Sequence, residues 1–113
     1  MGWLVSEDRV IAALEIAASR SDRRRGLMGR SGFDGALLLP KVRAVHTFGM
    51  RFPIDVAFVT ADESPETFTV VVVKEMVPHR LGLPVLKADA VIEATAGAFE
   101  RWGVGVGDRL EVR

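Results

Sequence analysis

The chain contains 113 residues, 49% of them hydrophobic, and its 15 basic and 15 acidic side chains give a formal net charge of zero. This length predicts a single domain spanning residues 1–113, large enough to bury a core without covalent staples. The lack of cysteine excludes disulfides, thiolate metal sites and a cysteine nucleophile, and the balanced charge gives no reason to expect a nucleic acid or an anionic membrane as a partner.

Alternating hydrophobic residues predict a series of short strands. The alanine-rich residues 9–18 also suit a helix, whereas residues 68–74 form a β-branched run typical of a strand buried on both faces. Residues 61–67 are polar and predict an exposed loop, and prolines between residues 76 and 87 indicate an irregular excursion. In chain order, we expect strands over residues 3–5, 9–18, 35–39, 42–48, 52–59, 68–74 and 89–95, and a last strand from a Gly107-Asp108 turn to residue 112.

Two short helices complete the prediction. The first begins at Ser21, because serine can accept a free backbone N–H, and ends at Gly29 or Gly32. The second covers residues 96–102 and ends at Gly103. The sequence therefore predicts an α+β domain of predominantly antiparallel strands, curled into a small barrel or a partly open sandwich that two short helices close.

Blocks of residues along nearly the whole chain resemble those of the family called domain of unknown function 192. The resemblance implies a compact β-rich domain with a short helix around the Arg-Gly-Leu-Met block, and the family has no settled biochemical role. The blocks are Arg25-Gly26-Leu27-Met28-Gly29-Arg30, Gly35-Ala36-Leu37-Leu38, Met50 with Pro53-Ile54-Asp55-Val56-Ala57-Phe58, and the C-terminal set Ala96-Gly97, Glu100-Arg101 and Gly107-Asp108-Arg109-Leu110.

The chain departs from this family pattern in two ways. Many relatives carry an export signal or a membrane anchor, whereas no apolar run here approaches the ~20 residues that span a bilayer. The first eight residues become acidic where a signal core would lie, so we expect a cytoplasmic protein. In a large branch of the family Lys-Asn-Thr follows the methionine, but here Arg51 and Phe52 follow Met50.

The most informative segment runs from His46 to Asp55, where a histidine and an acid flank a Gly-Met-Arg bend. A tight hairpin with Met50 and Arg51 at its tip would place the two side chains opposite each other, with Cβ atoms about 4.5–5.5 Å apart. They would then form a proton-transfer pair, a ligand anchor or a structural ion pair. A register slip of one residue would separate them, and the turn chemistry favours a loop that includes Gly49.

We expect this segment to line the binding pocket of a non-catalytic small-ligand or accessory module. An anionic group would bind Arg25 or Arg51, and His46 would supply a hydrogen bond that depends on pH. Phe48 and Met50 would form apolar walls. The candidate ligand-binding residues are His46, Phe48, Met50, Arg51, Asp55, Arg25 and Met28.

Two other functions stay open. A small hydrolase or isomerase would use His46 as a base and Asp55 to orient it, although the sequence contains no recognisable nucleophile motif. A protein partner or a second copy of the chain would instead bind aromatic residues on the surface, for which Trp3, Phe99 and Trp102 are the candidates. The sequence does not specify an oligomeric state.

Neither a cofactor nor a metal site is expected. His46 and Met50 could approach one ion only if the chain folds back at Gly49, and no third strong ligand is evident. The arginines at positions 20, 23, 24, 25 and 30 could bind phosphate or carboxylate, but they also suit a solvated helix face. Within this cluster Arg25 could form a structural ion pair with Asp55 or Glu100.

Overall fold

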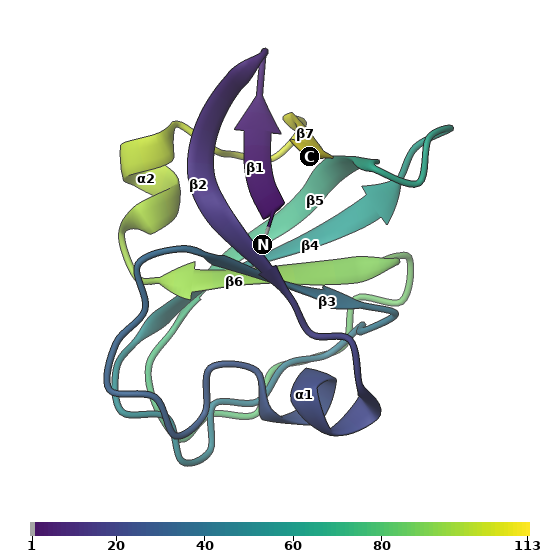
Figure 1. Cartoon of the computed structure of the whole chain (residues 1–113). Coiled ribbons are helices and arrows are strands. Elements are labelled where there is room, and N and C mark those ends of the chain that lie inside the picture. The colour runs from purple at the N-terminus through teal and green to yellow at the C-terminus, as the bar shows by residue number, and fades with distance from the viewer. Residues whose placement is uncertain (1) are drawn as a thin grey trace.

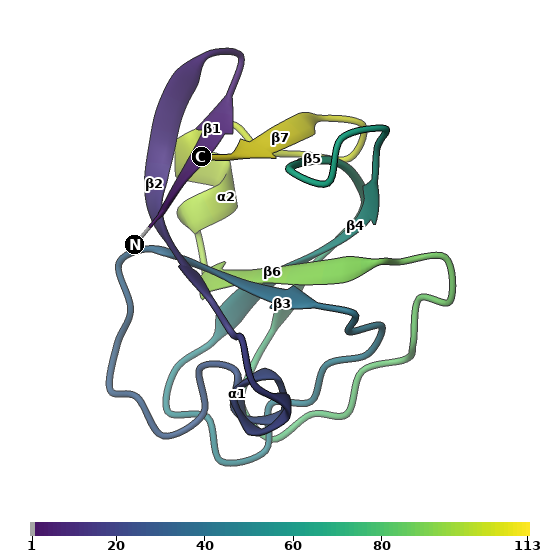
Figure 2. The ribbon, with the colours of Figure 1, turned by 45° about the vertical axis from the view of Figure 1, so that its right-hand side comes forward.

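The computed structural model describes residues 2–113, in which seven strands close into a barrel and two short helices lie at opposite ends of the molecule (Figures 1 and 2). The strands follow one another around the barrel in the order β1-β2-β3-β6-β4-β5-β7, and β7 pairs with β1. The strands are β1 (Gly2–Ser6), β2 (Arg9–Ile16), β3 (Ala36–Pro40), β4 (Ile54–Ala61), β5 (Thr67–Met76), β6 (Ala90–Thr95) and β7 (Arg109–Val112), and the helices are α1 (Arg20–Arg25) and α2 (Ala98–Trp102).

All strand pairs are antiparallel except β2 and β3, which run parallel. A parallel pair needs a crossover connection, and α1 lies within this one. The segments that join β3 to β4 and β5 to β6 extend to the same end of the molecule as α1 (Figure 2). The predicted α+β domain of predominantly antiparallel strands with two short helices is therefore confirmed, and of the two predicted forms, a barrel or a partly open sandwich, it has the barrel. Closure leaves no free edge among the described strands.

The central strands of the barrel bury both of their faces. On β4, Ala57 and Val59 belong to the interior cluster, which α2 closes with Phe99. On the other face, Val56 and Phe58 belong to an outer cluster that also contains residues of the connecting segments. Full burial of one such side chain stabilises a fold by about 1.5–3 kcal/mol, so the outer cluster holds the long connections, and Leu27 directly after α1, against the barrel wall.

The predicted strand over residues 42–48 does not form. Within it only His46 makes a β-bridge, to Leu81. Thr47 is fully buried, and its hydroxyl oxygen donates to the Val77 carbonyl at 2.7 Å and accepts from the Arg80 amide at 2.8 Å. Because β3 and β4 each already pair with two strands, the segment has no strand edge to join, and it packs against the β5–β6 connection instead.

Helix α1 also differs from its predicted bounds. Ser19, not Ser21, caps its start, and the Ser19 hydroxyl accepts a hydrogen bond from the Asp22 amide at 3.0 Å. The helix ends at Gly26, whose φ of 52° lies in the left-handed region that favours glycine, so it does not reach Gly29. No helix among residues 2–113 combines the length and the apolar character that a membrane crossing requires.

Candidate functional site

A crevice of about 290 Å³ lies between α1 and residues 42–50, above the outer hydrophobic cluster. One side is formed by the arginines of α1. Leu27, Leu39 and Met50 provide apolar walls, and each of these side chains is at most 5% exposed. The polar groups in the lining are His46, Glu93 and the arginines at positions 20, 23, 24 and 25.

Glu93 is the most unusual residue of the crevice. It lies on β6 between Leu37 of β3 and Val56 of β4, so the strand pairing carries its side chain toward the outer cluster with that of Val91. Its side chain is 3% exposed. Among residues 2–113, Glu93 Oε1 is the one buried side-chain nitrogen or oxygen without a hydrogen-bond partner.

Burial raises the pKa of Glu93 to about 7, and the backbone N–H of Leu27 offsets only part of this shift. None of the α1 arginines forms an ion pair with Glu93 within the described residues. An uncompensated carboxylate in such a place is costly, because desolvation disfavours its charged form. Near neutral pH the side chain is therefore divided between its neutral and ionised forms.

The end of α1 brings the backbone against this carboxyl group. The Gly26 N–H donates to the Asp22 carbonyl at 2.9 Å, and Leu27 is completely buried directly after it. A Cβ atom on Gly26 would lie 2.6 Å from Glu93 Oε1. Two separate reasons thus favour glycine at position 26 of the Arg-Gly-Leu-Met block. One is the positive φ angle, and the other is the close approach of the backbone to Glu93.

His46 lines the opposite side of the crevice. Its Nδ1 accepts a hydrogen bond from the Phe48 amide at 3.3 Å, and its ring stacks on the Phe48 ring with centroids 5.5 Å apart. Because Nδ1 is the acceptor, Nε2 is the ring nitrogen that can donate to another group. His46 therefore offers a hydrogen-bond donor at a half-buried position.

Asp55 lies elsewhere. It is on the face of β4 that carries the interior residues Ala57 and Val59, and its Oδ2 accepts hydrogen bonds from the amides of Gly97 at 3.0 Å and Phe99 at 3.1 Å. It therefore holds the start of α2. Within the described residues, His46 and Asp55 share no hydrogen bond, and the tight hairpin that would place them face to face is not formed.

The remaining candidate residues are divided between the crevice and its surroundings. Arg25 and Met50 line the crevice, whereas Phe48 and Arg51 are exposed and do not. Arg25 makes no ion pair with Asp55 or Glu100 in residues 2–113. Met28 lines an adjacent cavity.

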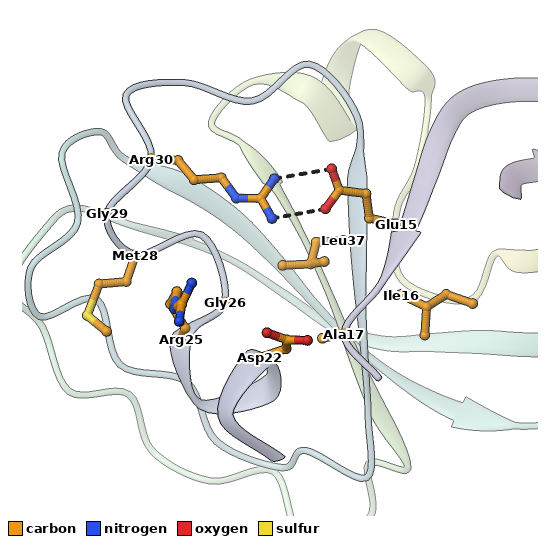
Figure 3. Close-up of a pocket in the computed structure, with 10 residues that line it drawn as sticks. All are labelled: Glu15, Ile16, Ala17, Asp22, Arg25, Gly26, Met28, Gly29, Arg30 and Leu37. Atoms are coloured by element: carbon orange, nitrogen blue, oxygen red, sulfur yellow. Dashed lines mark hydrogen bonds and ion pairs between the residues drawn. The ribbon is translucent and has the colours of Figure 1, made fainter. Parts of the chain in front are cut away.

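This adjacent cavity, of about 550 Å³, shares Arg25 and Gly26 with the crevice (Figure 3). On one side of it Arg30 and Glu15 form a two-fold ion pair, with nitrogen-to-oxygen distances of 2.9 and 3.2 Å. This pair lowers the pKa of the Glu15 carboxyl, chiefly through the hydrogen bond from Arg30. The charge of Glu15 is thus already compensated by Arg30, whereas Glu93 forms no ion pair among the described residues.

Comparison with known proteins places the chain in a family. The sequence profile of DUF192, described as an uncharacterised ACR, matches residues 4–112. The chain belongs to this family. The resemblance of the Arg-Gly-Leu-Met and Pro-Ile-Asp-Val blocks is therefore confirmed, and these DUF192 blocks now have structural roles at the end of α1 and the start of α2.

Two solved structures resemble this DUF192 chain. A proposed transcription regulator from Sinorhizobium meliloti 1021 has a TM-score of 0.78 and 26% identity, and the match covers 98% of this chain and 91% of that one. A protein of unknown function from Novosphingobium aromaticivorans DSM 12444 has a TM-score of 0.72 and 24% identity, with 87% and 73% covered. No curated protein matches the chain.

The aromatic residues expected at a partner surface are not together on the surface of the DUF192 barrel. Phe99 is 3% exposed and packs on the half-buried Trp102 with ring centroids 5.8 Å apart, whereas Trp3 is 48% exposed. The most exposed large apolar side chains belong instead to the β5–β6 connection. They are Leu81, Leu83 and Leu86, each at least 76% exposed.

Sequence reasoning missed Glu93. The residue lies in the correctly predicted strand over residues 89–95, among apolar neighbours whose two faces are both buried. An acid inside such a run is the signal that was present in the sequence, because a buried strand rarely contains an isolated carboxyl group. Its partners could not be inferred, since α1 and residues 42–50 cover it from distant parts of the chain.

Proposed function

We propose that this DUF192 chain is a non-catalytic module that binds a small anionic ligand in the crevice between α1 and residues 42–50. One observation supports this most directly. Four arginines and Glu93, whose Oε1 has no hydrogen-bond partner, line a single small crevice, and none of these arginines is paired with an acidic side chain in residues 2–113. Guanidinium groups bind carboxylates and phosphates through two parallel hydrogen bonds.

The composition of the crevice favours binding over catalysis. Of the described residues that line it, none is a serine, threonine or cysteine, so a hydroxyl or thiol nucleophile is not at hand. Among residues 2–113, His46 has no hydrogen bond to an acidic side chain that would orient it, and Asp55 is engaged by α2. A volume of about 290 Å³ suits a metabolite rather than a polymer.

The description of the Sinorhizobium relative as a proposed transcription regulator is compatible with a ligand-sensing module. It does not lead us to propose DNA binding for this chain. Helix α1 has six residues, which is short for a recognition helix in a major groove, and the formal net charge is zero. A regulatory output would therefore depend on a ligand and on a partner that reads it.

The test is thermal unfolding of the whole chain with inorganic phosphate, citrate, lactate, alanine, nucleotides and sugars. The variant Ala44→Trp fills the crevice from its exposed rim, and Val106→Trp adds the same ring to an exposed position outside the crevice. A ligand at 100 times its Kd adds about 2.7 kcal/mol to the stability of the wild type and of Val106→Trp. It adds nothing to Ala44→Trp.

Two results would contradict this function. One is an anion that stabilises Ala44→Trp as much as the wild type, because binding would then lie elsewhere on the chain. The other is the lack of stabilisation of the wild type by any of the anions. Stabilisation by double-stranded DNA, lost on replacing the arginines of α1, would instead favour a nucleic-acid partner.

A further inference from the structure

We infer that the ligand of this crevice is a small oxyanion that also carries a hydroxyl or amino group, with the oxyanion on the arginines of α1 and the donor group on Glu93. This inference rests on the proposed binding function and names its ligand class. It depends on two groups that line one crevice. The arginines of α1 have no acidic partner, and Glu93 Oε1 has no hydrogen-bond donor, among the described residues. A simple anion would bind the arginines but would leave Glu93 without a donor.

The arginine side carries excess positive charge on a very short element. Within Arg20–Arg25, four arginines accompany a single acid, Asp22. Arg20 and Arg24 are four residues apart, a spacing at which like charges on a helix repel. Arg23 donates to the neutral Ala18 carbonyl at 3.2 Å and forms no ion pair among the described residues. A carboxylate or phosphate at this rim would relieve the repulsion and accept several hydrogen bonds.

The Glu93 side needs a hydrogen-bond donor. Its Oε1 is an acceptor atom with no hydrogen-bond partner in residues 2–113, and the residues beside it on the neighbouring strands, Leu37 and Val56, are apolar. The titratable and charged groups that the described residues place in the rest of the crevice are His46 and the arginines of α1, and none of these forms an ion pair with Glu93. A ligand hydroxyl or ammonium group would supply the missing hydrogen bond.

The size of the crevice keeps these two requirements within one small molecule. Arg25 and Gly26 are adjacent in sequence and both border the crevice, and Gly26 packs directly against the Glu93 carboxyl group. The backbone of Arg25 is thus one residue away from the backbone that packs against Glu93, and the crevice that the Arg25 and Glu93 side chains line has a volume of only about 290 Å³. The two ligand groups should be only a few bonds apart, as in a hydroxy acid, an amino acid or a hydroxyalkyl phosphate.

Isothermal titration with matched probes tests this assignment. Lactate, alanine and propionate share a three-carbon acid skeleton and differ in a hydroxyl, an amino group or neither. Glycerol 3-phosphate and propyl phosphate form the corresponding phosphate pair. We expect the member with a donor group to bind the wild type about tenfold or more tightly than its partner, since a buried acceptor left unsatisfied opposes binding. The acid and phosphate sets distinguish the two sources of the oxyanion.

The variant Glu93→Leu removes the acceptor and keeps an apolar side chain of similar size. It should bind lactate and propionate equally, whereas the control Glu100→Gln, exposed on α2, should keep the wild-type preference. Equal binding of donor and donor-free probes by the wild type would overturn the ligand class and leave the binding function standing. If no probe in either set binds the wild type, the ligand class is wrong and the anion-binding function loses its support as well.

Discussion

The pH dependence of folding stability tests the burial of Glu93 directly. The folded chain raises the pKa of this carboxyl group from 4.5 to about 7 through desolvation. Between these two values the folded state holds a proton that the unfolded state releases, so the free energy of unfolding falls as pH rises through this window. Each pKa unit corresponds to about 1.36 kcal/mol, and the whole shift therefore costs about 3 kcal/mol of stability once the pH is well above 7.

The substitution Glu93→Gln isolates this effect because an amide of nearly the same shape does not titrate. Urea unfolding of both proteins, followed by far-ultraviolet circular dichroism at several pH values, gives the difference between their free energies of unfolding. As the pH rises from about 4.5 to 9, we expect the free energy of unfolding of the variant to increase by about 3 kcal/mol relative to that of the wild type. Ionisations elsewhere, such as that of Glu15 with its lowered pKa, cancel in this difference.

A constant difference between the two proteins across this range would refute the reasoning. It would mean that Glu93 titrates in the folded chain as it does in water, so that the carboxyl group is not desolvated beneath α1. Glu100→Gln is the control for the substitution itself. Because Glu100 is exposed, its difference from the wild type should stay within about 0.5 kcal/mol over the same range.

Three further stability measurements by urea unfolding test the contacts around the site. Gly26→Ala should lower the free energy of unfolding by at least about 1 kcal/mol more than Gly29→Ala. Both positions have a positive φ angle, but only a Cβ atom at position 26 would contact Glu93. Equal losses of stability in the two variants would exclude this close approach. Asp55→Ala should cost about 3 kcal/mol by removing a charged acceptor from two amides of α2, and a loss below about 0.5 kcal/mol would contradict this capping role. Arg30→Leu should cost less than about 1 kcal/mol despite its two-fold ion pair, because this pair is exposed.

Local sequence patterns were sufficient to predict most strands and, for β4, which residues lie on the same face. The alternation at residues 52–59 predicts that Val56 and Phe58 share a face and that Asp55 lies on the other, and β4 has this arrangement. The β-branched run became β5 as a strand, but the expected burial on both faces is wrong, since within residues 68–74 only Phe68 and Val70 are buried. These features depend on neighbours two residues apart, and the period of two in a strand determines them without knowledge of the rest of the chain.

The predictions that the structure contradicts concern features that depend on distant segments of the chain. Residues 42–48 alternate like a strand, but a strand needs an edge, and the neighbouring edges of β3 and β4 are occupied by strands from other parts of the sequence. The contact between His46 and Asp55 required a hairpin register that the loop around Gly49 does not provide. The parallel pairing of β2 with β3 follows from the path of the crossover through α1, which no local pattern specifies.

Asp55 and Glu93 show why the hydrogen-bond partners of a buried acid, rather than its burial, separate a structural role from a binding role. Asp55 is 7% exposed and accepts two amide hydrogen bonds that fix α2, so a ligand would have to compete with the fold for this carboxylate. Glu93 is 3% exposed, and its Oε1 has no hydrogen-bond partner in the part of the chain that the structure describes. The two acids also face opposite sides of the barrel wall, since Asp55 lies with the interior cluster and Glu93 beneath the crevice. A ligand at Glu93 can therefore gain an unused hydrogen bond without disturbing the interior that holds the barrel together.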